Sequence, residues 1–347
     1  MKNTFGNIVK IALPLLLGGA ILYWMYRGID FGRAEHILLH EMNWTWMLLS
    51  FPFGIMAQVF RGWRWKQTLE PTGEKPRTST SIYSIFISYA SSLVIPRIGE
   101  FMRCGILKRY DGVAFSKALG TVVTERAIDS LVVAIMTALT LLLQMSIFGT
   151  FFQKTGTNIE GILSRFTTTG YIVTLICGIA IVLLLYILLR RLSIYNKVKT
   201  TMKGIWQGIT SLKDVRNKWL FVFFTLGIWV SYFLHYYLTF FCFDFTENLG
   251  VSCALVTFIV GSMAVIVPTP NGAGPWHFAV KTMLILYGVV DEYALYFALV
   301  VHTVQTMMLI LLGVWGAIGL AMLKREGRGK ATGRRAKLGN ERREERD

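Results

Sequence analysis

Long apolar runs separated by short polar segments dominate the chain. A bilayer-spanning helix needs about 20 mostly apolar residues. Six runs meet or approach that length: 8–26, 44–60, 118–145, 170–189, 219–243 and 293–323. The first run could instead be a signal peptide, but it ends in Tyr23-Trp24-Met25-Tyr26 without a small-residue cleavage site, which favours a retained helix. The pattern therefore predicts an all-α polytopic membrane protein.

Two further apolar runs are interrupted by helix breakers. Residues 79–110 contain Val94-Ile95-Pro96, and residues 251–288 contain Ile266-Val267-Pro268. Proline ends a helix because it lacks an N–H and its ring clashes with the preceding turn. The segments flanking the first run are both basic, whereas those flanking the second are acidic. Each run is therefore predicted to be a re-entrant hairpin; the alternative is a plain eight- or nine-helix protein with proline kinks.

The order of these elements repeats along the chain. Residues 1–145 and residues 146–323 each read as span, span, hairpin, span, giving six full spans and two hairpins. Three spans is an odd number, so the second repeat would begin on the opposite side of the membrane and be inverted, as in many transporters. The remaining residues, 324–347, are basic and almost free of apolar side chains, which predicts a disordered cytoplasmic tail.

Composition and charge agree with a membrane location. The chain is 54% hydrophobic and 16% charged, against roughly 25% charged in soluble domains. The net charge of +16 does not indicate a nucleic-acid partner, because the basic residues lie between apolar runs and in the tail. Positive loops of this kind face the cytoplasm, so we expect a cytoplasmic (inner) membrane protein with both termini inside. The four cysteines are widely spaced, and no cofactor or metal motif is found.

Charged residues interrupt the first hairpin and the helix after it. They are Arg97, Glu100, Arg103, Glu125, Arg126 and Asp129. Charges at membrane depth are costly and by default suggest a functional site. Glu125 and Asp129 share one helix face, and the hairpin charges are their expected partners. The cluster could bind an anionic headgroup or couple to protons, or it could only lock the hairpin against the helix; the sequence leaves these open.

Two other places carry candidate chemistry. In the second hairpin, Asn271 lies in a glycine-rich turn with exposed amides, and His277 follows the breaker, where it could change charge near neutral pH. After the second span, Arg61 and Arg64 alternate with tryptophans. Such a basic and aromatic segment is typical of a membrane interface, and it is predicted either to anchor the orientation or to contact lipid phosphate.

Several motifs, taken in order, resemble a known family. They are Arg61-Gly62-Trp63-Arg64-Trp65, Pro96 with Gly99-Glu100 and Arg103, Glu125-Arg126 with Asp129, and Pro268-Thr269-Pro270-Asn271-Gly272-Ala273-Gly274. The set is similar to the transmembrane region of lysylphosphatidylglycerol synthases, a flippase-like family of bacterial and archaeal membrane proteins. That family often has a glutamate where His277 stands, so a carboxylate role is not carried over there. The soluble aminoacyl-transferase domain has no counterpart, so the resemblance implies lipid binding or translocation rather than lysine transfer.

The leading hypothesis is a flippase-like transporter of an anionic lipid, either a phospholipid or a polyprenyl phosphate, that enters between the two hairpins. Arginines 97, 103 and 126 would hold the phosphate, and the carboxylates would orient them or carry protons. A rival is an intramembrane lipid-modifying transferase with Glu125 or Asp129 as base, although no nucleophile–base pair is apparent. The third reading is a non-transporting scaffold for envelope synthesis, and self-association into a homo-oligomer is left open.

Overall fold

The computed structural model describes residues 18–27, 30–143 and 210–344, together with positions 16, 203, 206 and 207. Every regular element within these ranges is helical, and no strand occurs in them. Part of the predicted first span (8–26), the predicted loop 146–169, the predicted span 170–189 and most of the basic segment 190–218 lie outside the described residues.

The helices follow one another in a simple order. In the first half they are α2 (Phe31–His36), η1 (Ile37–Glu41), α3 (Trp44–Leu69), η2 (Glu70–Thr72), α4 (Thr78–Ser92), α5 (Ile98–Asp111) and α6 (Phe115–Leu143). In the second half they are η3 (Ser211–Asp214), α11 (Lys218–Tyr237), η4 (Leu238–Cys242), α12 (Asp244–Glu247), α13 (Gly250–Ala264), η5 (Pro270–Gly272), α14 (Pro275–Leu286) and α15 (Asp291–Glu344).

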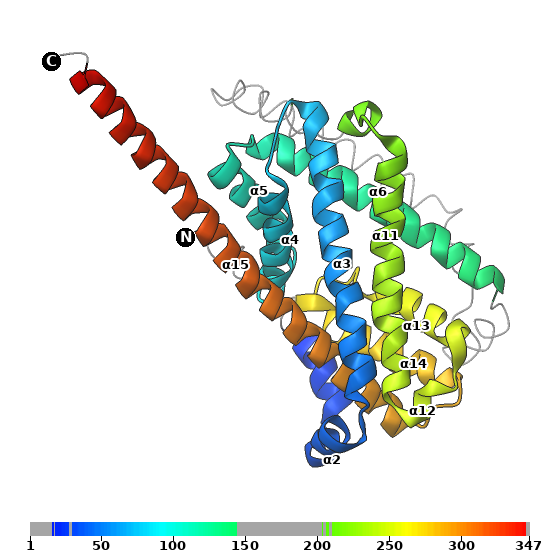
Figure 1. Cartoon of the computed structure of the whole chain (residues 1–347). Coiled ribbons are helices and arrows are strands. Elements are labelled where there is room, and N and C mark those ends of the chain that lie inside the picture. The colour runs from blue at the N-terminus through cyan, green and yellow to red at the C-terminus, as the bar shows by residue number, and fades with distance from the viewer. Residues whose placement is uncertain are drawn as a thin grey trace, which may run out of the picture.

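Helices α3 and α11 pack side by side in the middle of the molecule (Figure 1). Each begins at an asparagine cap: the Asn43 side chain accepts the Thr45 N–H and the Asn217 side chain accepts the Leu220 N–H, which satisfies otherwise unpaired donors. At Gly227 an added Cβ would lie 2.9 Å from the Phe60 ring. A small residue at this crossing lets the two backbones approach closely.

Both apolar runs with breakers fold as two helices joined by a turn. Helix α4 packs against α5, and α13 packs against α14. Among the described non-glycine residues, positive φ angles occur at Arg97 (63°) and Asn271 (51°), one in each turn. Each directly follows a proline, Pro96 or Pro270. The two turns thus share a proline followed directly by a residue with a left-handed backbone, at Pro96-Arg97 and Pro270-Asn271.

The two helical pairs lie in opposite halves of the molecule. Figure 1 shows α4 and α5 beside the end of α3, whereas α13 and α14 lie towards its beginning. Their neighbours are also exchanged: α4 packs on α15 and α5 on α6, whereas α13 packs on α6 and α14 on α15. The candidate site residues of the first half, such as Arg126, and of the second half, such as Asn271, are thereby brought to one cavity beside α3 and α11.

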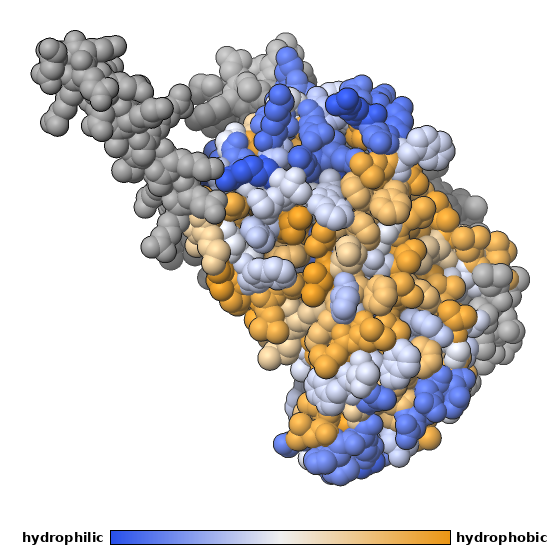
Figure 2. All heavy atoms as spheres, in the orientation of Figure 1, coloured by the Kyte–Doolittle hydropathy of each residue, from blue (hydrophilic) through white to orange (hydrophobic). Residues whose placement is uncertain are grey.

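The outer surface is apolar around its middle. Figure 2 shows a broad hydrophobic band between two hydrophilic ends. Exposed apolar side chains on α6 and α15 include Leu131, Ile135, Leu139, Leu142, Leu311, Trp315 and Met322. So much exposed apolar surface is rare on soluble monomers and is suited to contact with lipid.

Two described stretches, Lys218–Cys242 and Asp291–Leu323, are long and apolar enough to cross a membrane. Helices α3 and α6 have 26 and 29 residues, which also exceeds the length needed to span a bilayer, although both carry charged residues. The last helix extends further than expected: α15 runs unbroken from Asp291 to Glu344. The helix thus extends into the tail 324–347, for which disorder stays a prediction from composition. That segment contains no proline, so nothing interrupts the helical hydrogen bonds there.

Candidate functional site

A cluster of seven charged side chains lies where α3, α5 and α6 meet. We call it the charge cluster; its members are Arg61, Arg64, Glu100, Arg103, Glu125, Arg126 and Asp129. Four guanidinium groups face three carboxylates, so the cluster carries an excess of one positive charge when all groups are ionised. Such an arrangement is poised to accept an additional anion.

Asp129 joins three arginines. Its Oδ2 lies 2.6 Å from Arg61 Nη1, and its Oδ1 lies 2.8 Å from Arg64 Nη2. Arg126 Nη2, one helical turn away, lies 3.5 Å from Oδ2. The sequence placed Arg61 and Arg64 at the lipid interface, but the structure leaves only 3% and 0% of these residues exposed. Charges buried this deeply need a counter-charge, and α6 supplies it from more than 60 positions along the chain.

Glu125 forms a second, fully buried junction. Its Oε2 lies 2.7 Å from Arg103 Nη1, and its Oε1 lies 3.7 Å from Arg64 Nε. The Arg103 guanidinium also lies 4.5 Å from the centre of the Trp65 ring, a cation–π geometry. Nearer the surface, Glu100 Oε1 lies 3.5 Å from Arg126 Nε. The predicted pairing between the first hairpin and the charged helix is therefore present for Glu100 and Arg103.

Arg97 lies apart from this cluster. It caps the start of α5 with a left-handed backbone and an exposed side chain, and it makes no ion pair within residues 30–143 or 210–323. Its left-handed angle is uncommon for residues other than glycine and asparagine. Of the residues predicted to hold phosphate, the structure brings Arg103 and Arg126 together and leaves Arg97 outside.

The predicted residues of the second hairpin occupy a different polar region. The Asn271 side chain donates to Thr306 Oγ1 at 2.8 Å. His277 is buried, its Nδ1 accepts the Gly274 N–H at 3.2 Å, and its ring centre lies 4.4 Å from that of His302. His302 in turn donates from Nε2 to the Asn271 carbonyl oxygen at 3.1 Å. These bonds fix the turn after α13 against α15.

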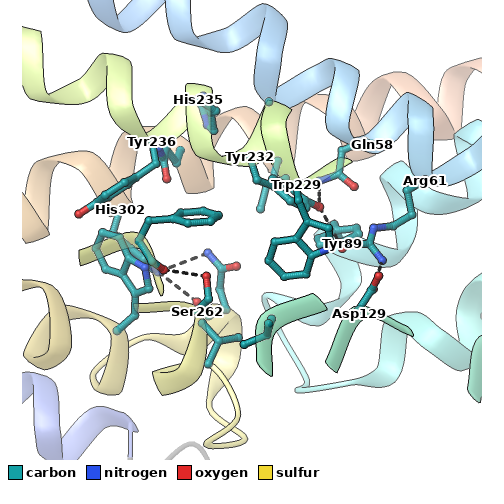
Figure 3. Close-up of a pocket in the computed structure, with 18 of the residues that line it drawn as sticks. Gln58, Arg61, Tyr89, Asp129, Trp229, Tyr232, His235, Tyr236, Ser262 and His302 are labelled. Carbon is teal, nitrogen blue, oxygen red and sulfur yellow. Dashed lines mark hydrogen bonds and ion pairs between the residues drawn. The ribbon is translucent and has the colours of Figure 1, made fainter. Parts of the chain in front are cut away.

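A cavity of about 430 Å³ joins the charge cluster to this second polar region, and we call it the main cavity. Figure 3 shows Arg61 and Asp129 at one side of it and His302 and Tyr236 at the other. The main cavity is also lined by Arg126 and Asn271, so two regions predicted separately from the sequence share one space. Its size is typical of sites for small ligands or headgroups.

Several lining residues were not predicted from the sequence: Gln58, Tyr89, Trp229, Tyr232, His235, Tyr236, His302 and Gln305. Gln58 donates to the Tyr232 hydroxyl at 3.0 Å, and Tyr232 donates to the Tyr89 hydroxyl at 3.1 Å. The Arg61 guanidinium lies 5.8 Å from the centre of each tyrosine ring. An amide side chain within an apolar helix, as at Gln58 and Gln305, was the sequence signal that could have identified lining residues. The aromatic lining residues gave no such signal, because aromatic residues are common throughout this chain.

A second cavity, of about 560 Å³, lies on the other side of His302. It is lined by Tyr23, Tyr26, Arg27 and His277 among others. His302 lines both cavities. Within the residues that the structure describes, no group of three or more His, Cys, Asp or Glu side chains could hold a metal ion.

The arrangement is therefore a membrane-suited helical fold with a cavity that has one positively charged end. A family model described as the lysylphosphatidylglycerol synthase TM region matches residues 11–313. No curated protein and no solved structure matches the chain. The matched range includes the whole charge cluster and both helical pairs. The chain is thus a membrane protein of lipid metabolism and belongs to the lysylphosphatidylglycerol synthase TM region family.

Proposed function

We propose that this protein is a flippase-like transporter that binds the headgroup of an anionic lipid in the main cavity. The observation that carries the proposal is the position of Arg61 and Arg126 at one end of an otherwise largely apolar cavity. Asp129 lies about 20 Å along α6 from its start at Phe115, which is near the middle of a bilayer. A positive site at that depth lowers the cost of moving a phosphate across the hydrocarbon core.

The repeat relationship supports transport. The exchanged packing of α4 and α13, and of α5 and α14, is what an approximate twofold axis between α3 and α11 would produce. Inverted repeats with broken helices near the membrane midplane are a common plan of secondary transporters. We therefore infer that residues 1–145 and 146–323 are two inverted repeats, and that each helical pair is a re-entrant hairpin.

Within the site, the buried and the accessible arginines have different tasks. Arg61 and Arg64 are fixed by Asp129 and hold the local positive charge in place. The Arg126 side chain is 43% exposed and its two ion-pair contacts are both 3.5 Å long, so it can exchange a carboxylate for a lipid phosphate at little cost. Arginine suits this task because its planar fork can bind two phosphate oxygens at once.

Arg126→Ala is expected to slow headgroup translocation in proteoliposomes about tenfold or more, because a charge-assisted hydrogen bond to phosphate is lost. Arg77→Ala is the matched control. Arg77 is also partly exposed and pairs with Asp111 at 2.7 Å, but it does not line the main cavity, so its rate should equal that of the parent. Equal rates for Arg126→Ala and the parent would contradict the proposal, and a new lipid product in mass spectra would favour a transferase.

Labelling of introduced cysteines tests the inverted arrangement. In a Cys177→Ser background, Arg109→Cys is expected to react with a membrane-impermeant maleimide from the cytoplasmic side and Val290→Cys from the opposite side. Arg109 lies near the end of α5 and Val290 lies just after α14, so each exposed position is at the base of a different helical pair. The cysteines that remain, Cys104, Cys242 and Cys253, are buried. Labelling of both positions from the same side would exclude inverted hairpins.

A further inference from the structure

We infer that the bound headgroup carries a sugar or another ring polyol next to its phosphate. This inference rests on the proposed function and names the substrate class of the same cavity. The charged lining residues among the described ones are Arg61, Arg126 and Asp129, and all belong to the charge cluster. The rest of the cavity must therefore be matched by a part of the ligand that is uncharged.

An ammonium headgroup fits this cavity poorly. Asp129 is the sole carboxylate among the described lining residues, and arginines 61, 64 and 126 already surround it. A lipid amine would meet this net positive end without a free counter-charge, and like charges repel at short range. The cavity thus disfavours aminated lipids and leaves neutral polar groups as partners.

Seven buried polar atoms of the lining lack a hydrogen-bond partner in the described part of the chain. Two are the Nε atoms of Arg61 and Arg126, and the other five are uncharged: Gln58 Oε1, Trp229 Nε1, His235 Nε2, Tyr236 Oη and Gln305 Nε2. Gln58 and His235 are both more than nine-tenths buried. Buried polar atoms without partners are uncommon because each is costly. Five uncharged atoms of this kind in one cavity therefore indicate a ligand that supplies the partners.

The five uncharged atoms include both donors and acceptors. The Trp229 and Gln305 nitrogens donate, and Gln58 Oε1 accepts. His235 Nδ1 lies 2.9 Å from the Ser50 carbonyl oxygen, so Nδ1 carries the proton and Nε2 of the neutral ring accepts. A phosphate oxygen only accepts and an ammonium only donates, whereas a hydroxyl group does both. Several hydroxyls on one ligand match this mixed set best.

Aromatic side chains connect the charged end to the far end of the cavity. Their ring centres are 6.4 Å apart for Trp229 and Phe258, 6.0 Å for Phe258 and Tyr236, and 6.2 Å for Tyr236 and Trp276. Trp276 then lies 5.2 Å from His302. The faces of such rings are electron-rich and attract the weakly positive C–H groups of a sugar or inositol ring. The wall thus suits a ring that has apolar faces and polar edges.

Binding to the purified full chain tests the inference. The probes are dioctanoyl forms of phosphatidylinositol, phosphatidic acid and phosphatidylethanolamine, with dissociation constants measured by calorimetry. We expect phosphatidylinositol to bind about tenfold more tightly than the other two, since each added hydrogen bond contributes a few-fold. Equal binding of phosphatidylinositol and phosphatidic acid by the parent would overturn the inference.

Two substitutions separate polyol recognition from phosphate recognition. Gln305→Met keeps the approximate shape of the side chain, Trp229→Phe keeps an aromatic ring, and both remove the donor. Each should weaken phosphatidylinositol about five- to tenfold and leave phosphatidic acid unchanged. Trp315→Phe is the control, because Trp315 is an exposed tryptophan on α15 outside the cavity. Equal weakening of both lipids by the two variants would also overturn the inference.

The same assay distinguishes this failure from failure of the proposed function. If no anionic lipid binds and Arg126→Ala has no effect, the proposed function itself is wrong. If phosphatidic acid binds through Arg126 but the polyol adds nothing, only the further inference is wrong. A polyprenyl phosphoglucose probe identifies the lipid source: tighter binding than phosphatidylinositol indicates a polyprenyl lipid, and weaker binding indicates a phospholipid.

Discussion

Asp129→Asn is expected to destabilise the folded protein by about 3–5 kcal/mol, the usual cost of removing one partner from a buried ion pair. Asp129 contacts Arg61 at 2.6 Å and Arg64 at 2.8 Å, and both arginines are buried. An asparagine keeps the shape but removes the charge, so the two guanidinium groups would remain desolvated with Glu125 as their nearest compensation. Unfolding in detergent, followed by tryptophan fluorescence, measures the change.

Asp291→Asn provides the control for this substitution. Asp291 also forms an ion pair, with Lys281 at 2.9 Å, but its side chain is 68% exposed. Exposed pairs contribute about 0–1 kcal/mol, so this variant should unfold almost as the parent does. If Asp129→Asn were as stable as Asp291→Asn, the charge cluster would not be the buried network described above.

Gly99→Ala is expected to destabilise the protein by about 3 kcal/mol or more and to separate α5 from α4. An added Cβ at Gly99 would lie 2.6 Å from the Ser88 carbonyl carbon and closer still to its oxygen. These are backbone atoms of α4 and cannot move aside as a flexible side chain could, so the overpacking cost is large. Glu100 and Arg103 lie on the same helix, and their ion pairs with α6 should weaken as α5 shifts.

Gly105→Ala on the same helix is the matched control. No atom lies within 4 Å of a Cβ built at Gly105, and alanine is favoured over glycine inside a helix by about 0.5–1 kcal/mol. This variant should therefore be as stable as the parent or slightly more so. Similar unfolding curves for Gly99→Ala and Gly105→Ala would mean that α4 and α5 do not cross at Gly99.

Much of the fold could be predicted because its signals are local. Hydropathy marks the apolar runs, and prolines break two of them, so the pairs α4 with α5 and α13 with α14 follow from the order of residues. A proline alone is not decisive, because Pro52 lies within α3 without ending it. The matching of Pro96 with Pro268 stays a prediction. Two prolines stand close together at 268 and 270, and the left-handed residue Asn271 follows the second of them, as Arg97 follows Pro96.

The site could be predicted only in part, because it depends on helix rotation. Glu125 and Asp129, predicted on one helix face, both pair with Arg64, and Arg103, an expected partner, pairs with Glu125. Arg61 and Arg64 follow an apolar run, and such a position is more often an interface anchor. Whether they point to lipid or to α6 is set by how α3 packs against α11 and α6, which no short stretch of sequence encodes.

The sequence by itself determined that this is a helical membrane protein with two broken apolar runs and unusual charges among them, because hydropathy and helix breaking act within a few residues. Only the tertiary structure decided which charges meet, how Arg61 and Arg64 are buried, and that a cavity joins the two helical pairs. These features arise where α3, α6, α11 and α15 approach one another. Contacts between residues far apart in the chain are fixed by side-chain packing, and packing is a property of the whole fold.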